Sequence, residues 1–148
     1  MTFNFLNLKL YFTMSYKIID IEGIGEAYAP KLIEQGIETV EQLLDACEAP
    51  TGRKIIAEKT GIPEKLILKW TNHADLFRIN GIGPQFAELL EAAGVDTVKE
   101  LRHRVAANLA AKVAEINEEK HLCGRVPAEV EIQKMIDQAK ELPPRMTY

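Results

Sequence analysis

The chain has 148 residues, 47% hydrophobic and 27% charged, a balance typical of a globular protein with a buried core. No stretch reaches the roughly 18 consecutive apolar residues of a membrane helix, and two cysteines, Cys47 and Cys123, are too few for a disulfide scaffold, so we expect a cytoplasmic protein with no membrane contact. The net charge of −4 argues against a broadly basic surface, so any binding of nucleic acid should be local or weak.

The N-terminal segment differs from the rest of the chain. Residues 1–13 are rich in Phe, Leu and Asn, and Met14 begins a more conventional start. The segment lacks the cationic front and small-residue cleavage site of a secretory signal. We therefore interpret residues 1–14 as an extension that is disordered or an artefact of the start codon.

An internal repeat organises the remainder. Shifting the chain by 58 residues aligns 21–44 with 79–102, and ten of these 24 pairs are identical. The identical pairs are Ile21/Ile79, Gly23/Gly81, Ile24/Ile82, Gly25/Gly83, Ala29/Ala87, Leu32/Leu90, Gly36/Gly94, Thr39/Thr97, Val40/Val98 and Leu43/Leu101. This pattern predicts an all-α tandem duplication, with one unit over 15–76, a second over 77–142 and a tail at 143–148.

Each copy begins with a Gly-Ile-Gly turn. The two glycines allow positive φ angles and close backbone approach, and the isoleucine between them can fill the core. A helix follows, carrying Tyr28, Ala29, Leu32 and Ile33 in the first copy and Phe86, Ala87, Leu90 and Ala93 in the second, at helical spacing. Gly36 and Gly94 are placed to end these helices in the left-handed conformation.

The next helix of each copy opens with a capping box. Thr39 with Gln42, and Thr97 with Glu100, have the S/T-x-x-E/Q spacing. The predicted buried stripes of these helices are Val40, Leu43 and Leu44 in the first copy and Val98, Leu101 and Val105 in the second.

The sequence also predicts helices in the later part of each copy. In the first, Thr51 can cap a helix ending near Thr60, Gly61 stops it, and Pro63 suits the start of another. In the second, we expect helices over 108–119 and 129–142, separated by an insertion at 121–127. Pro143 and Pro144 stop the last helix and predict a frayed tail.

The Gly-Ile-Gly turns, with an alanine four residues beyond the second glycine, resemble the helix-hairpin-helix motif of DNA repair and recombination proteins. The run from Ile21 to Leu44, together with the segments 52–54, 58–62 and 74–83, is similar to the DUF4332 family, small prokaryotic proteins of unassigned function. That family resembles the helix-turn-helix region of flap endonucleases, which is a likeness of fold and not of chemistry.

The resemblance implies a sequence-independent contact with DNA. Backbone amides around Gly23, Ile24 and Gly25, or around Gly81, Ile82 and Gly83, would face a phosphate at a helix N-terminus. No organic cofactor is expected, although hairpin carbonyls in related motifs hold a monovalent cation. The position two residues after the second glycine, a cation in those relatives, holds Ala27 or Gln85 here.

Charge favours the second copy as the phosphate site. Residues 15–76 contain seven Lys/Arg and eleven Asp/Glu, whereas 77–125 contain seven of each. The expected cationic contacts of the second hairpin are Arg78, Lys99, Arg102 and Arg104. In the first copy Glu22 and Glu26 lie on the hairpin, and Pro30 removes an amide from the helix that follows.

Several alternatives remain open. The glycine turns also suit a purely structural role, and acidic helical repeats suit a protein-interaction adaptor without nucleic-acid binding. Arg53 and Lys54 form a possible anion site near a helix start, but a solvated helical turn is the simpler interpretation. The aromatic residues Trp70, Tyr28 and Phe86 are expected in the core rather than stacked on bases.

No catalytic or metal site is expected. The sequence His121-x-Cys123 lacks the paired spacing of a zinc site. A flap-type nuclease needs carboxylates that converge on two metal ions, whereas the nearest acidic pair, Asp20 and Glu22, more simply flanks a helix end. Both cysteines are predicted to be free, buried thiols.

Overall fold

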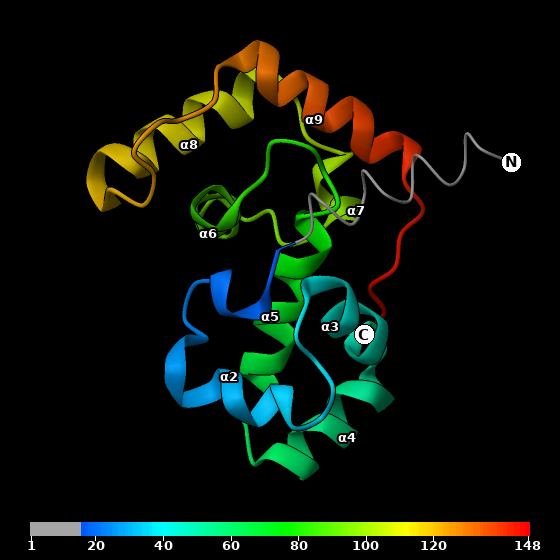
Figure 1. Cartoon of the computed structure of the whole chain (residues 1–148). Helices are drawn as coiled ribbons and strands as arrows, with labels where there is room; N and C mark the ends of the chain where they lie inside the picture. Colours follow the sequence, from blue (N-terminus) through cyan, green and yellow to red (C-terminus); the bar gives the residue numbers. More distant parts are fainter. Residues whose placement is uncertain (1–15) are drawn as a thin grey trace, which may run out of the picture.

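The computed structural model describes residues 16–148, so the predicted extension at 1–14 lies outside the described residues. The described chain contains a short 3-10 helix and eight α-helices, which confirms the all-α prediction (Figure 1). The elements are η1 (Ile18–Asp20), α2 (Gly25–Ile33), α3 (Val40–Cys47), α4 (Pro50–Thr60), α5 (Glu64–Leu76), α6 (Pro84–Ala92), α7 (Val98–Leu101), α8 (Ala106–Lys120) and α9 (Glu129–Glu141).

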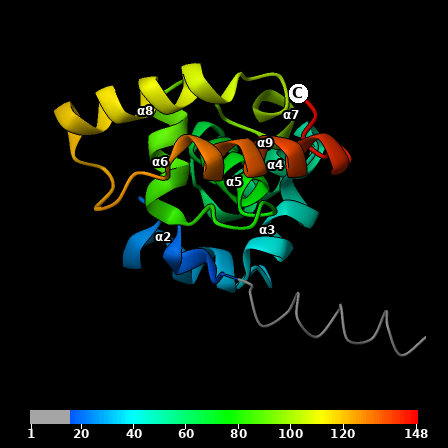
Figure 2. The ribbon, with the colours of Figure 1, turned by 90° about the horizontal axis from the view of Figure 1, so that it is seen from above.

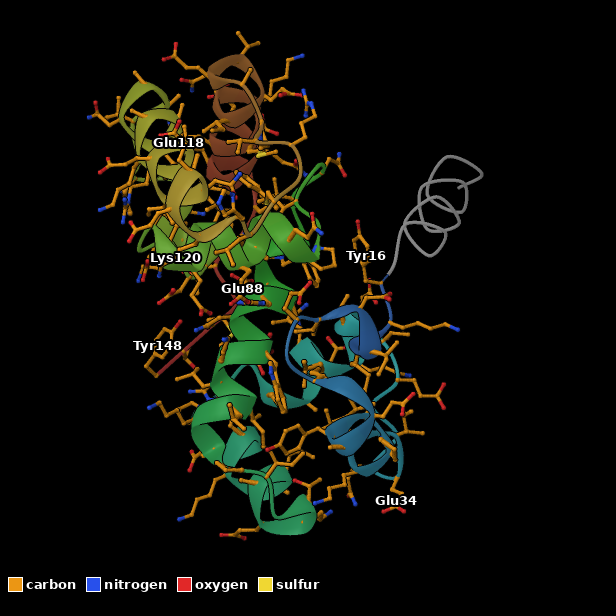
Figure 3. The ribbon with its side chains drawn as sticks, turned by 90° about the vertical axis from the view of Figure 1, so that its left-hand side faces the viewer. Tyr16, Glu34, Glu88, Glu118, Lys120 and Tyr148 are labelled. Carbon is orange, nitrogen blue, oxygen red and sulfur yellow. The ribbon has the colours of Figure 1, made fainter. Side chains whose placement is uncertain are left out.

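Two hydrophobic cores lie at the two ends of α5. The first half (residues 16–74) packs η1 and α2–α4 against the early turns of α5, with Ile67 and Trp70 buried there. The second half (residues 76–142) packs α6–α9 around a core that starts at Leu76. Seen from above, α8 and α9 cover the second half while α2 and α3 lie on the opposite side (Figure 2). Helix α5 is therefore shared by both halves (Figure 3).

The glycine caps form as predicted. Gly36 and Gly94 have φ angles of +79° and +89°. The amide of Ile37 donates to the carbonyl of Leu32 at 3.0 Å, and the amide of Val95 donates to Leu90 at 2.8 Å. These bonds satisfy carbonyls at the ends of α2 and α6. The matching conformations agree with a duplication, which itself stays a prediction.

The two predicted capping boxes differ. The side chain of Thr39 accepts from the amide of Gln42, whose side chain accepts from Thr39 in return. Thr97 accepts from the amide of Glu100, but the Glu100 carboxylate accepts from Asp96 instead. Helix α7 ends after four residues. The predicted burial of Val105 is therefore wrong: it lies beyond α7, just before α8, with 60% of its surface exposed.

Helix α4 begins two residues earlier than predicted. Pro50 is its first residue and Ala49 its N-cap, so Thr51 is not the cap. Proline suits this position because its fixed φ is helical and the missing amide would be unpaired anyway. Gly61 ends α4 with a φ of +74°, as predicted. Helices α8 and α9 occupy the two predicted C-terminal helical segments.

The last six residues, 143–148, form a C-terminal strap that crosses back to the first half, where the chain end lies beside α3 (Figure 1). Met146 is buried in the first core. The amide of Thr147 donates to the carbonyl of Glu48 at 3.0 Å, and its carbonyl accepts from Arg53 at 2.8 Å. The predicted fraying is wrong because the strap buries an apolar side chain and pairs its backbone groups.

Candidate nucleic-acid interface

The two glycine hairpins share their first half. Gly23 and Gly81 have φ angles of +92° and +91°, and the isoleucines that follow them, Ile24 and Ile82, are buried. The amide of Ile24 donates to Ile21 at 3.3 Å, as does that of Ile82 to Ile79 at 3.2 Å. Each isoleucine thus fixes its turn to the core and leaves the glycine before it at the surface.

The second glycines differ. Gly25 has a φ of +55°, whereas Gly83 is extended, with φ −104° and ψ −174°. The predicted positive φ is therefore wrong for Gly83. Pro84 follows Gly83, and the steric demand of a proline ring pushes the preceding residue out of the helical region. Gly83 consequently acts as the N-cap of α6 and not as part of the helix.

Hairpin two (residues 79–83) presents unpaired amides at the start of α6. Within residues 16–148, the amides of Gly81 and Gly83 donate to no protein acceptor, and α6 has no side-chain cap. The amide of Asn80, between them and α5, already donates to the side chain of Gln138 in α9 at 3.0 Å. Two of the predicted backbone donors are therefore available and a neighbouring one is not.

The surroundings of hairpin two are close-packed. A Cβ atom at Gly81 would lie 3.2 Å from the end of Met135, and one at Gly83 would lie 3.3 Å from the hydroxyl of Tyr16. Tyr16 packs against Phe77 with ring centroids 5.0 Å apart and ring planes tilted by 43°. These aromatic rings and the hairpin line a pocket of about 110 Å³ between the two halves.

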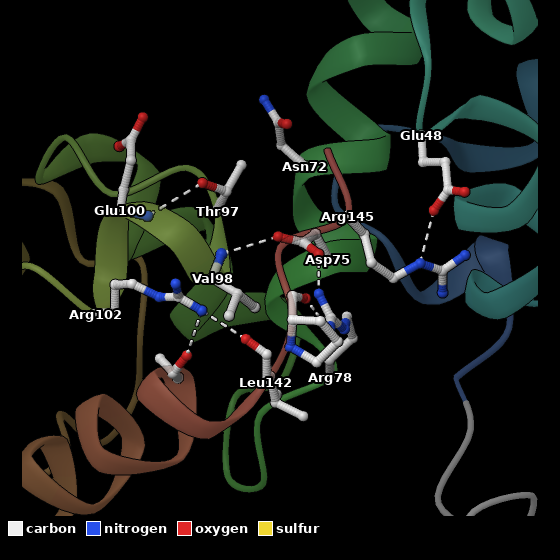
Figure 4. Close-up of polar contacts among 12 residues, drawn as sticks. Glu48, Asn72, Asp75, Arg78, Thr97, Val98, Glu100, Arg102, Leu142 and Arg145 are labelled. Atoms are coloured by element: carbon white, nitrogen blue, oxygen red, sulfur yellow. Dashed lines mark hydrogen bonds and ion pairs between the residues drawn. The ribbon is translucent and has the colours of Figure 1, made fainter. Parts of the chain in front are cut away.

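Two predicted phosphate ligands have partners inside the protein (Figure 4). One amino group of Arg78 donates to Asp75 at 2.8 Å and the other to the carbonyl of Pro143 at 2.7 Å. Arg102 donates to the carbonyls of Ala139 and Leu142 at the end of α9. Both guanidinium groups therefore satisfy carbonyl oxygens where α9 meets the strap.

The other two predicted cationic side chains make fewer contacts within the protein. Lys99 is exposed on α7 and makes no ion pair within the described part of the chain. Arg104 is half-buried and donates to the carbonyl of Gly94 at 2.9 Å. No hydrogen bond ties Lys99 or Arg104 to α9 or the strap among the described residues, but Arg104 lies beside Gly94, at the opposite end of α6 from hairpin two.

Hairpin one (residues 21–25) is open but acidic. A Cβ atom at Gly25 would meet nothing within 4 Å, and both Glu22 and Glu26 are exposed. Glu22 and Gly23 line a cavity of about 210 Å³ together with Lys69, Gln85 and Glu88. Helix α2 continues through Pro30, so that residue does not break it.

A polar cluster between α5 and α6 was missed at the sequence level. His73 is fully buried, and its Nε2 lies 2.8 Å from the carboxylate of Glu91. Lys69 lies 3.5 Å from the same carboxylate and 3.7 Å from that of Glu88. The hydrogen bond from His73 is the main cause of a lowered pKa at Glu91. The four-residue spacing of Lys69 and His73 was the available signal, since it places both on one face of α5.

Arg53 is buried, so the predicted solvated turn is wrong for this residue. Its guanidinium donates to the carbonyls of Cys47 and Glu48, each at 3.0 Å, and to the carbonyl of Thr147 in the strap.

The prediction that Trp70 and Phe86 belong to the cores is confirmed by their burial. Trp70 packs against Tyr28 with centroids 5.1 Å apart.

The buried thiols are poor nucleophiles. Burial raises the pKa of Cys47 to about 11, partly opposed by the nearby charge of Arg53, and burial also raises the pKa of Cys123.

Among residues 16–148, no group of three or more His, Cys, Asp or Glu side chains could hold a metal ion. Asp20 accepts from the amide of Lys17 at 3.1 Å, so it flanks the end of η1 as predicted.

The protein is thus an all-helical molecule with two cores and two glycine hairpins. Residues 22–142 match the model of a family described as "Domain of unknown function (DUF4332)", and the chain belongs to this family. No curated protein and no solved structure matched the chain. In the described part, no helix has both the length and the apolar character needed to span a bilayer.

Proposed function

We propose that this protein is a non-catalytic module that binds DNA weakly and without regard to sequence, through hairpin two. The observation that carries the proposal is the exposed glycine turn at the uncapped N-terminus of α6, where the amides of Gly81 and Gly83 have no acceptor among the described residues. A helix N-terminus with free amides favours an anion because the helix dipole and the N–H groups act together.

Side-chain charge adds contacts away from the hairpin itself. Lys99 is exposed on α7, and Arg104 lies beside Gly94 at the far end of α6, where a duplex that runs along α6 from hairpin two would present further phosphates. We therefore expect two to four phosphate contacts in total, counting the backbone donors. The carbonyl of Ile79 has a second lone pair beside its bond to Ile82, which a monovalent cation could use in bridging to the phosphate. Two buried cysteines suit a reducing compartment, and we propose a cytoplasmic location.

Salt titration tests this function. With duplex DNA, the logarithm of the binding constant should fall with log[salt] at a slope of about −2 to −4, using about 0.9 per phosphate. The double variant Lys99→Gln/Arg104→Gln should reduce the magnitude of the slope by about 1.8, since two phosphate contacts are lost. The matched control Lys31→Gln/Lys54→Gln removes the same charge from exposed positions in the first half. Absence of binding to single-stranded, duplex and flap DNA at low salt would refute the proposal.

A protein-interaction adaptor is the second candidate, and hairpin one favours it. Glu22 and Glu26 would repel phosphate, but with the neighbouring cavity they suit a basic side chain of a partner protein. Capture of a partner by the native chain, but not by Glu22→Gln/Glu26→Gln, would support this function. Equal capture by both chains would exclude hairpin one as the contact.

A further inference from the structure

Hairpin two contains an asparagine followed directly by a glycine. Asn80 and Gly81 are the two central residues of its turn, and both are exposed. The amide of Ile82 closes the turn by donating to the carbonyl of Ile79 at 3.2 Å. The side-chain carbonyl carbon of an asparagine is an electrophile that the amide nitrogen of the next residue can attack. A glycine in that next position has no Cβ atom to hinder the attack.

The reacting groups are free of hydrogen bonds. The amide of Gly81 donates to no acceptor within residues 16–148, so its nitrogen can attack without first giving up a partner. In the same part of the chain, the one hydrogen bond of Asn80 joins its own amide to the side chain of Gln138 at 3.0 Å. That bond lies on the other side of the Asn80 Cα atom from the reacting peptide group. The side-chain amide of Asn80 is therefore free to turn toward Gly81.

The other described asparagines lack this combination. They are Asn72 in α5 and Asn108 and Asn117 in α8. Asn108 is exposed, as Asn80 is, but the amide that follows it, that of Leu109, donates to the carbonyl of Val105 at 2.9 Å. The helix holds this peptide group, and a leucine side chain hinders the approach. Asn108 is consequently an internal control for Asn80.

We propose that Asn80 and Gly81 form a site of spontaneous deamidation that converts hairpin two into an acidic turn. The nitrogen of Gly81 forms a bond to the side-chain carbonyl carbon of Asn80, and the side-chain nitrogen leaves as ammonia, taking up the proton that the Gly81 amide loses. Water then opens the cyclic imide at either of its two carbonyl groups. One product has aspartate at position 80, and the other has an isoaspartyl residue, in which the main chain continues through the former side chain.

Hairpin one shows that this kind of turn accepts a carboxylate. Glu22 aligns with Asn80 in the internal repeat. Its turn is closed by the equivalent bond, from Ile24 to Ile21 at 3.3 Å, and the glycine after it also has a positive φ, +92°. The aspartyl product can therefore keep the turn, while its new negative charge lies beside the free amide of Gly81. The resulting loss of phosphate binding rests on the proposed binding of DNA.

Incubation of the native chain at mildly alkaline pH, followed by tryptic digestion and mass spectrometry, tests the site. Trypsin releases residues 79–99 and 105–112 as separate peptides, so one digest follows both Asn80 and Asn108. We expect Asn80 to deamidate in the native chain within an order of magnitude of its rate in the urea-unfolded chain, and Asn108 to react far more slowly than Asn80. The variant Asn80→Gln should remove the fast mass gain from peptide 79–99. A native rate for Asn80 more than an order of magnitude below the unfolded rate would overturn the proposal.

The effect on binding is measured separately. Asn80→Asp should weaken the binding of duplex DNA at low salt on the order of two- to fivefold, because it places a negative charge at the helix N-terminus that faces the phosphate. Lys31→Gln makes the same change in net charge on α2, in the first half, and should cause a smaller loss. Equal losses would overturn the effect of deamidation on the phosphate site. Failure of the native chain to bind DNA would overturn the proposed function, whereas the mass measurement would still decide the deamidation site.

Discussion

The carboxylate of Asp75, in the last turn of α5, accepts a hydrogen bond from the amide of Val98, the first residue of α7, at 2.9 Å. Its other oxygen accepts from Arg78 at 2.8 Å. One buried carboxylate thus satisfies an unpaired donor at a helix start and neutralises a guanidinium. The start of α7 is therefore positioned by α5 as well as by its own capping threonine.

Substitution of this carboxylate should destabilise the second half. Asp75→Asn keeps the size of the side chain but removes the charge that faces Arg78 and Val98. Because hydrogen bonds to charged groups contribute more than neutral ones, we expect a loss of about 1.5–3 kcal/mol in the free energy of unfolding by urea. Asp137→Asn, on the exposed surface of α9, is the control and should change stability by less than about 0.5 kcal/mol. Equal effects would contradict this role for Asp75.

The corner between α3 and α4 should tolerate no side chain at Gly52. A Cβ atom there would lie 1.9 Å from the carbonyl oxygen of Ala46, which is backbone and cannot rotate away. We expect Gly52→Ala to cost about 3 kcal/mol, the upper end of the usual range for overpacking, since the contact is with backbone and forces the helices apart. Gly124→Ala is the matched control because nothing lies within 4 Å of its Cβ. Thermal melting followed by circular dichroism measures both, and a native melting temperature for Gly52→Ala would show that the corner can relax.

The hydrogen bond between His73 in α5 and Glu91 in α6 should make stability depend on acid pH. Hydrogen bonding to His73 lowers the pKa of Glu91 below its ordinary value of 4.5 in the folded protein. A carboxyl with a lower pKa in the folded state stabilises the fold above its unfolded-state pKa, and this stabilisation is lost as the pH falls through the folded value. The stability difference between the native chain and Glu91→Gln should therefore shrink between about pH 6 and pH 3. Glu115→Gln, exposed on α8, should show no such convergence.

Asp96 should give stability the opposite dependence on pH. Burial, with the nearby charges of Glu100 and Glu91, raises its pKa in the folded protein. A raised carboxyl pKa favours folding at low pH and opposes it once the pH exceeds the folded value. Asp96→Asn should consequently be more stable than the native chain at pH 7, and the gain should disappear as the solution is acidified. Urea unfolding at several pH values measures the effect, and a constant difference would contradict it.

Cys47 should be inert in the native protein. Its side chain is fully buried, and with a pKa of about 11 the reactive thiolate is nearly absent at pH 8. In the Cys123→Ser background, iodoacetamide should label Cys47 only at the rate of unfolding and rapidly in concentrated urea. Fast labelling of the native protein would show that the first core opens locally around α3.

Features set by neighbouring residues were predictable from the sequence. The caps at Gly36 and Gly94 and the capping box of Thr39 and Gln42 follow from local backbone requirements, and all form. The extended conformation of Gly83 also has a local cause, its neighbour Pro84, whose effect on the turn was overlooked.

Features set by distant residues were not predictable in this way. Arg78 and Arg53 pair with carbonyls 65 and 94 residues further along the chain, in the strap. No periodicity or spacing near either arginine indicates such a partner, so both were assigned to solvent or to phosphate. The glycine turn at 79–83 therefore lies where the sequence placed it, whereas the electrostatic surroundings of the candidate site depend on where the last six residues return.

The position of α5 between the two cores has a consequence for how the molecule melts and how it can be divided. Ile67 and Trp70 at one end, and Leu76 at the other, fill different cores from one continuous helix. If either core unfolds and α5 unwinds with it, the other core loses a helix that packs against it. The native chain should therefore absorb heat in a single calorimetric peak, and a gene cut at either end of α5 should leave one fragment without this helix, which aggregates instead of folding.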